Sequence, residues 1–227
     1  MKTHFEHLLE SFPKILYGSV LDVGAGRGSF LIDAVSHGVD TEGIEFKQDN
    51  IKIALQKARA LNLEIKLKQG RGEDLPYEDN QFDFVNLCEV IEHVEYPQKV
   101  LSEIYRVFKL RGEVYMSVPN RFGFKDQHFH MYFINWMPRA WSEKIILWFN
   151  KQKNYDGGSG FQRLSEMHYS TYREMDKMVS SIGFNAFDLR EQKLMEKIPN
   201  FLKFIFIPIY RFLRLFIFNA FHFKLVK

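Results

Sequence analysis

Three closely spaced glycines in the first part of the chain have a spacing that suits ligand binding. Gly24, Gly26 and Gly28 follow a short apolar run and open a segment with helical spacing. Glycine permits positive φ and close approach of the backbone to a ligand, and the N-terminus of the following helix offers unpaired N–H groups. The pattern alone is weak, because nicotinamide-dependent oxidoreductases use a related loop and an ordinary tight turn has similar spacing.

Two acidic residues near this loop narrow the choice of ligand. Asp22 lies two residues before the first glycine, where a carboxylate would repel a pyrophosphate but suits a cationic amino-acid group. Glu45 ends the next expected strand, where an acid can accept hydrogen bonds from both hydroxyls of a ribose. Together they indicate a ligand that carries a nucleoside and a positively charged amino acid.

A short run of acids and histidine follows the fourth expected strand. Glu89, Glu92 and His93 lie within five residues, and on a helical turn residues three apart share a face. They are therefore predicted to converge on one ion or on one acceptor group. This mixed ligand set would accept Mg²⁺, Mn²⁺, Fe²⁺ or Zn²⁺. The alternative is that the acids cap helices while His93 lines the acceptor site or acts as a base.

His128 and His130 are further candidates for acid–base chemistry. They flank Phe129 in the aromatic run at 121–141, so in an extended chain their side chains share a face. In that arrangement they would place or deprotonate a hydroxyl group. The alternative is a packed aromatic lid in which both histidines only complete hydrogen bonds.

The elements around these residues alternate as they do in parallel sheets. Short apolar runs and helical runs follow one another from residue 19 to residue 118, which is typical of βαβ units. The expected strands span 19–23, 40–45, 63–68, 82–87, 113–118, 184–190 and 221–226. Helices are expected at 3–11, from the glycine loop to 37, and at 48–60, 97–109, 138–150 and 171–182. The sequence therefore predicts one α/β domain over 1–227, with a Rossmann-like, seven-stranded, mostly parallel sheet and helices on both faces.

An aromatic, irregular segment follows the fifth expected strand. Residues 120–170 predict a lid inserted over the acceptor site, and the Gly-rich run at 155–160 is either its hinge or a plain surface loop.

A Phe-rich helical insertion at 198–218 precedes the last expected strand. It approaches the length of a membrane span, but charged residues interrupt it. Lys203 and Arg214 lie about three helical turns apart and share a side, and a basic stripe on an apolar helix favours a membrane surface over a crossing. We therefore expect membrane-surface contact through residues 199–218. A helix pair buried on the domain and a dimer interface are the alternatives.

Bulk composition limits the partners and the compartment. The chain has 227 residues, of which 46% are hydrophobic, and this suits one domain with insertions. A net charge of +3 gives no reason to expect nucleic acid as a partner. The single Cys88 excludes an intramolecular disulfide and fits a reducing cytosol, and the first residues lack the apolar stretch of a signal peptide. We expect a cytoplasmic protein, with membrane association left open; the oligomeric state does not follow from the sequence.

Residues 18–119 resemble class I S-adenosylmethionine-dependent methyltransferases, and residues 168–190 resemble them more weakly. The resemblance lies in four motifs, namely Val-Leu-Asp-Val-Gly-Ala-Gly-Arg-Gly at 20–28, the stretches 69–83 and 112–119, and Glu-Val-Ile-Glu-His-Val at 89–94. It implies that S-adenosylmethionine is the cofactor. The residues expected to line its pocket are Asp22, Gly24, Ala25, Gly26, Gly28, Glu45, Phe46, Gly72, Glu73 and Leu87. Many relatives carry Asp where this chain has Arg71, so adenine contact is expected from Glu73 or from backbone groups.

Within this class, the run from Glu89 to His93 is similar to two groups. These are ubiquinone-pathway O-methyltransferases and small-RNA 3′-terminal 2′-O-methyltransferases. In both, the Glu, Glu and His of the motif bind a divalent metal that activates a hydroxyl, and in the RNA group a later His completes the site. The resemblance implies a metal at Glu89, Glu92 and His93, with His168 as the matching later residue. Many metal-free members of the class carry the same run.

The sequence thus predicts an S-adenosylmethionine-dependent methyltransferase that acts on a hydroxyl of a small, apolar or lipid-linked acceptor. His93, His128 and His130 are its candidate catalytic residues. The reaction is a displacement at a sulfonium methyl group, and positioning can supply much of its acceleration. One alternative is metal-dependent methylation of RNA 3′ ends, which predicts a basic groove that the charge of +3 speaks against. The other is a non-catalytic, cofactor-binding interaction protein.

Overall fold

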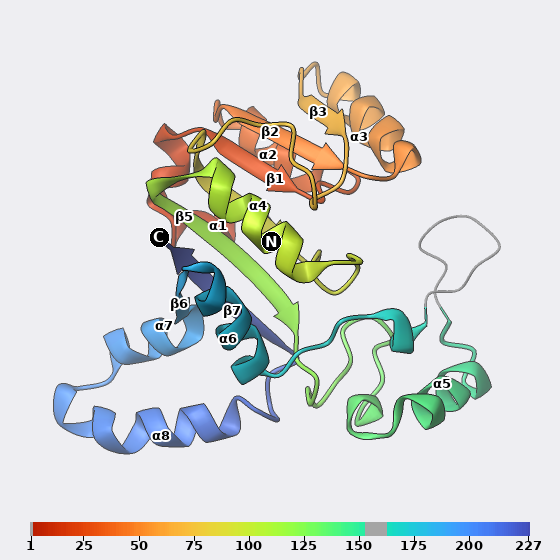
Figure 1. Cartoon of the computed structure of the whole chain (residues 1–227), viewed down its shortest axis with the longest axis vertical. Helices are drawn as coiled ribbons and strands as arrows, with labels where there is room; N and C mark the ends of the chain where they lie inside the picture. The colour runs from red at the N-terminus through yellow and green to blue at the C-terminus, as the bar shows by residue number, and fades with distance from the viewer. Residues whose placement is uncertain (1, 153–162) are drawn as a thin grey trace.

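The computed structural model describes residues 2–152 and 163–227, so the Gly-rich run at 155–160 lies outside the described residues. One seven-stranded sheet forms the centre of the described chain (Figure 1). Its strands are β1 (Val20–Val23), β2 (Thr41–Glu45), β3 (Lys66–Gln69), β4 (Phe82–Cys88), β5 (Phe108–Pro119), β6 (Asn185–Asp188) and β7 (Ala220–Val226).

The strands lie in the order β3-β2-β1-β4-β5-β7-β6. Strands β1 to β5 pair in parallel, and β7 runs antiparallel between β5 and β6. This confirms the predicted Rossmann-like, mostly parallel sheet. The strand order reverses between β1 and β4, and open α/β sheets bind ligands beside the carboxyl ends of the strands at such a point.

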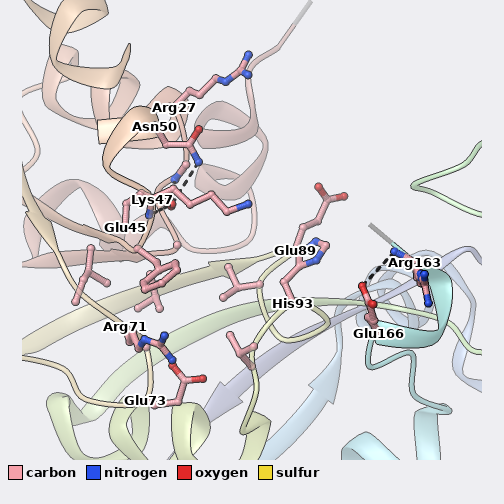
Figure 2. A pocket seen from close by; sticks show the side chains of 18 of the residues that line it. Arg27, Glu45, Lys47, Asn50, Arg71, Glu73, Glu89, His93, Arg163 and Glu166 are labelled. Atoms are coloured by element: carbon pink, nitrogen blue, oxygen red, sulfur yellow. Dashed lines mark hydrogen bonds between the residues drawn. The ribbon is translucent and has the colours of Figure 1, made fainter. Parts of the chain in front are cut away.

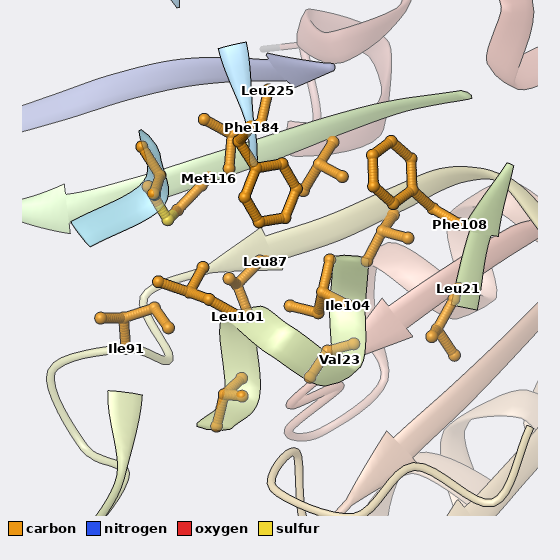
Figure 3. Close-up of a cluster of buried hydrophobic side chains, with 14 of the residues drawn as sticks. Leu21, Val23, Leu87, Ile91, Leu101, Ile104, Phe108, Met116, Phe184 and Leu225 are labelled. Carbon is orange, nitrogen blue, oxygen red and sulfur yellow. The ribbon is translucent and has the colours of Figure 1, made fainter. Parts of the chain in front are cut away.

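Helices cover both faces of the sheet, so the central strands are apolar throughout. The helices α4 (Pro97–Val107) and α6 (Tyr172–Ile182) pack on one face, where Leu21, Val23 and Leu87 are buried between them and the strands (Figure 3). The helices α1 (His4–Leu9), α2 (Ser29–Ser36) and α7 (Leu189–Lys197) contribute to the core on the other face. Helix α3 (Gln48–Ala60) packs against α2, and a 3-10 turn, η1 (Pro13–Tyr17), precedes β1. Burial on both faces explains why β1 and β4 lack the polar alternation of a half-exposed strand.

Two expected boundaries are wrong for local reasons. The sixth strand was expected to reach residue 190, but it ends at Asp188, whose Oδ1 accepts hydrogen bonds from the backbone N–H groups of Arg190 and Glu191 at 2.9 and 3.2 Å. This cap begins α7, a helix that the sequence did not predict. Strand β5 begins at Phe108, directly after α4, so Gly112 lies inside the strand rather than before it.

The lid begins where β5 ends (Figure 1). Its described part contains η2 (Ile134–Trp136), α5 (Arg139–Trp148) and η3 (Leu164–Glu166). It has a small core of its own, formed by Phe129, Ile134, Ile146, Leu164, Met167 and Tyr169. The lid is therefore a packed substructure beyond the carboxyl end of β5 (Figure 1).

The Phe-rich segment forms η4 (Asn200–Leu202) and α8 (Lys203–Leu213) at the periphery, beyond α7 (Figure 1). None of the helices in the described residues is long and apolar enough to cross a membrane. Arg214 was predicted to form a basic stripe that faces a membrane surface, and this prediction is wrong. The residue lies just after α8, and its side chain points toward the domain. Its Nη1 donates to Asp188 Oδ2 at 3.1 Å and to Glu191 Oε2 at 3.2 Å.

Candidate active site

A cavity of about 1630 Å³ lies at the carboxyl edge of the parallel strands. Its walls come from the residues that follow β1, β2, β3 and β4, and lid residues line the opposite side (Figure 2). Its lining includes Gly24, Gly26, Glu45, Phe46, Gly72, Glu73, Glu89, His93, Phe129, Ile146, Leu147 and Leu164. The cavity thus lies at the reversal of strand order, next to β1 and β4.

The glycine loop has all three glycines at positive φ, and two of them, Gly24 and Gly26, line this cavity. Gly24 has φ +70°, and a Cβ atom there would lie 2.5 Å from Val90 Cγ2, so only glycine fits. Gly26 has φ +53°, and a Cβ atom there would meet no atom nearer than 4.0 Å. The absent side chain of Gly26 therefore leaves open space at the cavity wall, which a ligand can fill.

Glu45 ties the end of β2 to the glycine loop. Its Oε2 accepts a hydrogen bond from the Gly26 backbone N–H at 2.8 Å. Its Oε1 accepts from the Lys47 backbone N–H at 2.8 Å and from Asn50 Nδ2 at 3.3 Å (Figure 2). A carboxylate has about four acceptor positions, so lone pairs remain for the hydroxyls of a ribose. The sequence did not predict Lys47 and Asn50 at this site, although both lie within five residues of the predicted acid.

Asp22 is buried behind the loop rather than on the cavity wall. Alternation along β1 places it on the sheet face opposite to Val23, and its Oδ1 accepts from Asn86 Nδ2 at 2.7 Å. Asp22 Oδ2 has no hydrogen-bond partner among the described residues. Burial raises the pKa of Asp22 to about 7, and the nearby charge of Glu45 adds to the effect. The carboxyl is therefore poised to ionise when positive charge arrives nearby.

The other predicted cofactor residues divide between the wall and the core. Phe46 is half exposed, and the Arg71 guanidinium lies 4.6 Å from its ring centroid, so Arg71 covers an aromatic surface on which a nucleobase can stack. Three predicted residues besides Asp22 do not line the cavity, namely Ala25, Gly28 and Leu87. Leu87 belongs to the hydrophobic core beneath α4, and Gly28 is the N-cap of α2.

His93, His128 and Glu92 meet at the end of β4. The Nε2 atoms of His93 and His128 are 3.3 Å apart, and Glu92 Oε1 lies 3.9 Å from the first and 3.8 Å from the second. Glu92 is 0% exposed, and neither carboxylate oxygen has a hydrogen-bond partner among the described residues. Burial raises the pKa of Glu92 to about 8 and lowers that of His93 to about 4. Only His93 of the three lines the cavity.

Two lid residues hold His128 in place. The Tyr169 hydroxyl donates to Asp126 Oδ2 at 2.8 Å and lies 2.7 Å from His128 Nδ1. Asp126 Oδ1 accepts from the backbone N–H groups of His128 and Phe129 at 2.8 and 2.6 Å. Because the Tyr169 proton is directed to Asp126, its oxygen accepts from His128, which puts the His128 proton on Nδ1. His128 Nε2 is then the acceptor that faces His93.

The expectation that His128 and His130 share a face of an extended chain is wrong. The chain turns at Asp126, and the His130 backbone N–H donates to the Asp126 carbonyl at 3.1 Å. His130 has φ +56° and its side chain is exposed, whereas His128 is buried. The turn directs His128 toward the core and His130 away from it.

The four predicted metal ligands do not gather at one point. Among the described residues, the group whose ligand atoms lie within 4.8 Å of one another is Glu92, His93 and His128. The Glu89 carboxylate is not part of it, and its backbone N–H donates to Ser117 Oγ at 2.9 Å. The His168 side chain is exposed, while its backbone N–H donates to the Glu92 carbonyl at 2.9 Å.

The fold and the cavity define a class of nucleoside-binding α/β proteins with a glycine loop after β1 and an acid after β2. Comparison with known proteins agrees. Residues 21–116 match the family described as a methyltransferase domain. The demethylmenaquinone methyltransferase of Oceanobacillus iheyensis is 31% identical over 179 residues, which cover 76% of this chain and 71% of that protein.

Two solved structures share the fold. The YcgJ protein of Bacillus subtilis has a TM-score of 0.61 and 14% identity, with 98% of this chain and 97% of that chain covered. A SAM-dependent methyltransferase of Thermotoga maritima, described as a possible histamine N-methyltransferase, has a TM-score of 0.56 and 16% identity, with 98% and 96% covered.

This chain belongs to the class I S-adenosylmethionine-dependent methyltransferases. It is an enzyme, and S-adenosylmethionine is its cofactor. The residues present fit that cofactor, because Gly26 leaves space at the loop, Glu45 offers carboxylate lone pairs and Phe46 offers an aromatic surface.

Proposed function

We propose that this enzyme transfers the methyl group of S-adenosylmethionine to a hydroxyl of a small, apolar or lipid-linked acceptor. The observation that carries the proposal is the position of His93, which reaches the cavity and has His128 Nε2 3.3 Å behind it. One relative, at 31% identity, is named for demethylmenaquinone. This name supports a small, lipid-linked quinone as the acceptor.

The cofactor side of the cavity is assigned to the residues after β1 to β3. Glu45 would accept hydrogen bonds from the ribose hydroxyls, the loop at Gly24 and Gly26 would let the cofactor approach the backbone closely, and Phe46 would offer its ring to the adenine. Asp22 contributes charge from behind the loop, because a cationic ligand favours its ionised form. When bound, S-adenosylmethionine supplies an electrophilic methyl group on a sulfonium sulfur.

The acceptor side is assigned to the lid and the end of β4. The lid lines this part of the cavity with the apolar residues Phe129, Ile146, Leu147 and Leu164, beside the charged residues Glu143, Arg163 and Glu166. The apolar residues suit an apolar acceptor.

His93 would accept the proton of the acceptor hydroxyl as the methyl group is transferred. S-adenosylmethionine would supply the methyl group and keep the electron pair of the carbon–sulfur bond, so the proton would stay on His93. His128 Nε2 accepts a hydrogen bond from His93 Nε2–H and so stabilises the protonated ring.

A divalent cation is a second way for this cluster to activate a hydroxyl. The donor set fits, because the buried Glu92 carboxylate has no hydrogen-bond partner among the described residues and two imidazoles face it. Glu92, His93 and His128 would then hold the ion, which would lower the pKa of the hydroxyl.

We propose further that residues 199–218 contact a membrane surface, where a lipid-linked acceptor is held. The proposal is compatible with the exposed apolar side chains of α8.

The test is methyl transfer to a short-chain prenylated hydroquinone, measured by mass spectrometry of the product. We expect His93→Ala to lose at least about a hundredfold in kcat, which is the usual contribution of a positioned base. His130→Asn is the matched control. It removes an exposed imidazole from the lid, and asparagine tolerates the positive φ of this position. Equal rates for both variants would remove His93 from the reaction.

A further inference from the structure

Helix α8 exposes large apolar side chains on most of its circumference. Phe204 is 74% exposed, and Ile205 and Phe206, which follow at 100° steps around the helix, are exposed as well. Phe212, one to two turns further on, is 64% exposed. No residue of α8 is fully buried. A helix that is apolar on nearly all sides normally lies in a protein core or in hydrocarbon.

Two of the three charged side chains of this segment pair with the domain, and the third, Lys203, is the first residue of α8. Arg211 donates from Nη2 to Glu191 Oε1 at 2.6 Å, and Arg214 donates to Asp188 and Glu191. The Tyr210 hydroxyl donates to Asp188 Oδ2 at 3.0 Å. These polar contacts fix one side of α8 on α7 and its cap. From residue 204 to residue 209 the sequence has no charged residue, so the remaining sides of this part of the helix are uniformly apolar.

The apolar surface continues from α8 into the lid. Ring contacts connect Phe212 to Phe216 at 5.9 Å, Phe216 to Trp136 at 6.1 Å, and Trp136 to Phe133 at 5.4 Å. Phe133 in turn contacts Phe124, with ring centroids 4.6 Å apart. All five side chains are exposed. We call this set, together with Phe204, Ile205 and Phe206, the apolar platform.

The occupant of the platform that fits these observations is a lipid bilayer. A groove on a partner protein covers one stripe of a helix, whereas three consecutive exposed apolar residues point in three directions. Acyl chains cover all of them at once. The two arginines are paired with Asp188 and Glu191, which offsets their charge, and the described helices are not long enough to cross. We propose that the apolar platform inserts into one leaflet of a membrane, with α8 lying in the interfacial plane.

This placement has a consequence for the active site, and it rests on the proposed function. Phe129 lines the cavity and Phe133, four residues later in the same lid segment, belongs to the platform. A platform inserted in the leaflet therefore holds the acceptor side of the cavity next to the lipid phase. An acceptor with a lipid tail reaches His93 without its tail leaving the membrane.

The test is flotation of the full chain with vesicles of phosphatidylcholine and phosphatidylglycerol, without cofactor or acceptor. We expect the wild type to float, and the variant Phe204→Ser/Phe206→Ser/Phe212→Ser to bind at least about tenfold more weakly. The matched control is Tyr17→Ser/Leu61→Ser/Leu110→Ser, which removes three exposed apolar side chains elsewhere on the chain. It is expected to float like the wild type.

Three outcomes would overturn the proposal. The first is a wild type that does not float with the vesicles, and the second is equal binding by the two triple variants. The third is a wild-type dimer that the platform variant converts to a monomer, by light scattering, while neither form binds vesicles, because the platform is then an interface between copies. Calorimetry with S-adenosylmethionine shows that each variant is folded. Vesicle binding is read without turnover, so it stands or fails separately from the proposed methyl transfer.

Discussion

The variant Asp126→Asn tests how the lid sets the direction of the hydrogen bonds at the active site. Asp126 Oδ1 accepts two backbone N–H groups, and Oδ2 accepts the Tyr169 hydroxyl. An asparagine of the same shape keeps its oxygen on the backbone groups and presents its NH₂ to Tyr169. The Tyr169 proton must then go to His128 Nδ1, so the His128 proton moves to Nε2 and faces His93. The hydrogen bonds within the lid are kept, but His128 Nε2 now donates toward His93 and no longer accepts from it.

The magnitude follows from this reversal. No buried group loses its partner, so we expect a change of about 1 kcal/mol or less in the free energy of unfolding. His93 loses the hydrogen-bond acceptor that His128 Nε2 provides. We therefore expect kcat to fall by about tenfold to a thousandfold, with the affinity for S-adenosylmethionine unchanged. The assays are urea denaturation, product formation by mass spectrometry, and ¹⁵N NMR of the His128 tautomer.

Two further variants complete this test. Tyr169→Phe leaves Asp126 Oδ2 and His128 Nδ1 without their partner, so it is expected to cost about 2–4 kcal/mol of stability as well as activity. Tyr132→Phe, which removes a hydroxyl from an exposed lid tyrosine, is the control. If Asp126→Asn switches the tautomer while kcat stays at the wild-type value, the relay from the lid to His93 has no catalytic role.

Three other predictions concern cofactor, pH and metal. Glu45→Ala is expected to weaken S-adenosylmethionine binding by about a hundredfold, or roughly 3 kcal/mol, in calorimetry, while Glu42→Ala on the same strand leaves it unchanged; equal affinities would reject the ribose assignment. Because burial raises the pKa of Asp22 from 3.8 to about 7, the folded chain keeps a proton that the unfolded chain releases, and wild-type stability falls as pH rises between these values. Asp22→Asn lacks this loss, so its free energy of unfolding in urea should rise relative to that of the wild type from pH 4.5 to pH 8, while it binds the cofactor more weakly. A difference in stability that does not change with pH would contradict the raised pKa of Asp22. If a divalent cation binds the cluster, the absorption band of bound Co²⁺ should disappear in His128→Ala and remain in His168→Ala. The opposite pattern would support the ligand set that the resemblance implies, which includes His168.

The sheet was predictable because its strands are buried on both faces. Such strands read as short apolar runs between helical segments, and helix α3 was expected at 48–60, where it lies. The missed helix α7 had a local signal, since Asp188 is followed three residues later by Glu191, which is the spacing of a helix cap. The aromatic Phe187 and the apolar Leu189 on either side of Asp188 favoured a longer strand instead.

The cofactor wall was predictable only in part. Glu45 and the glycines were found because the loop after a strand has its own requirements of φ and space. Asp22 was expected on the wall because it belongs to a motif, but alternation along β1 turns its side chain away from the face of Val23. Leu87 lies on the face of Val23 but is buried in the core beneath α4. Applying that alternation from Val23 backward would have placed Asp22 behind the loop.

The partner of His93 could not be predicted from spacing. His128 and His168 both lie in the lid, and which one reaches Glu92 depends on how the lid packs on the sheet. Asp126 held a partial signal, because aspartate accepts backbone N–H groups two and three residues on and so forms turns. A turn at this position excludes the extended chain that would have aligned His128 with His130.

The most direct test of the account is the atom that receives the methyl group. The enzyme is incubated with S-adenosylmethionine labelled with ¹³C in its methyl group and with a prenylated hydroquinone in lipid vesicles, and the product is examined by ¹³C NMR. We predict an O-methyl resonance for the wild type and none for His93→Ala. A label on a ring carbon, or no transfer by an enzyme that binds the cofactor, would contradict hydroxyl methylation with His93 as the base.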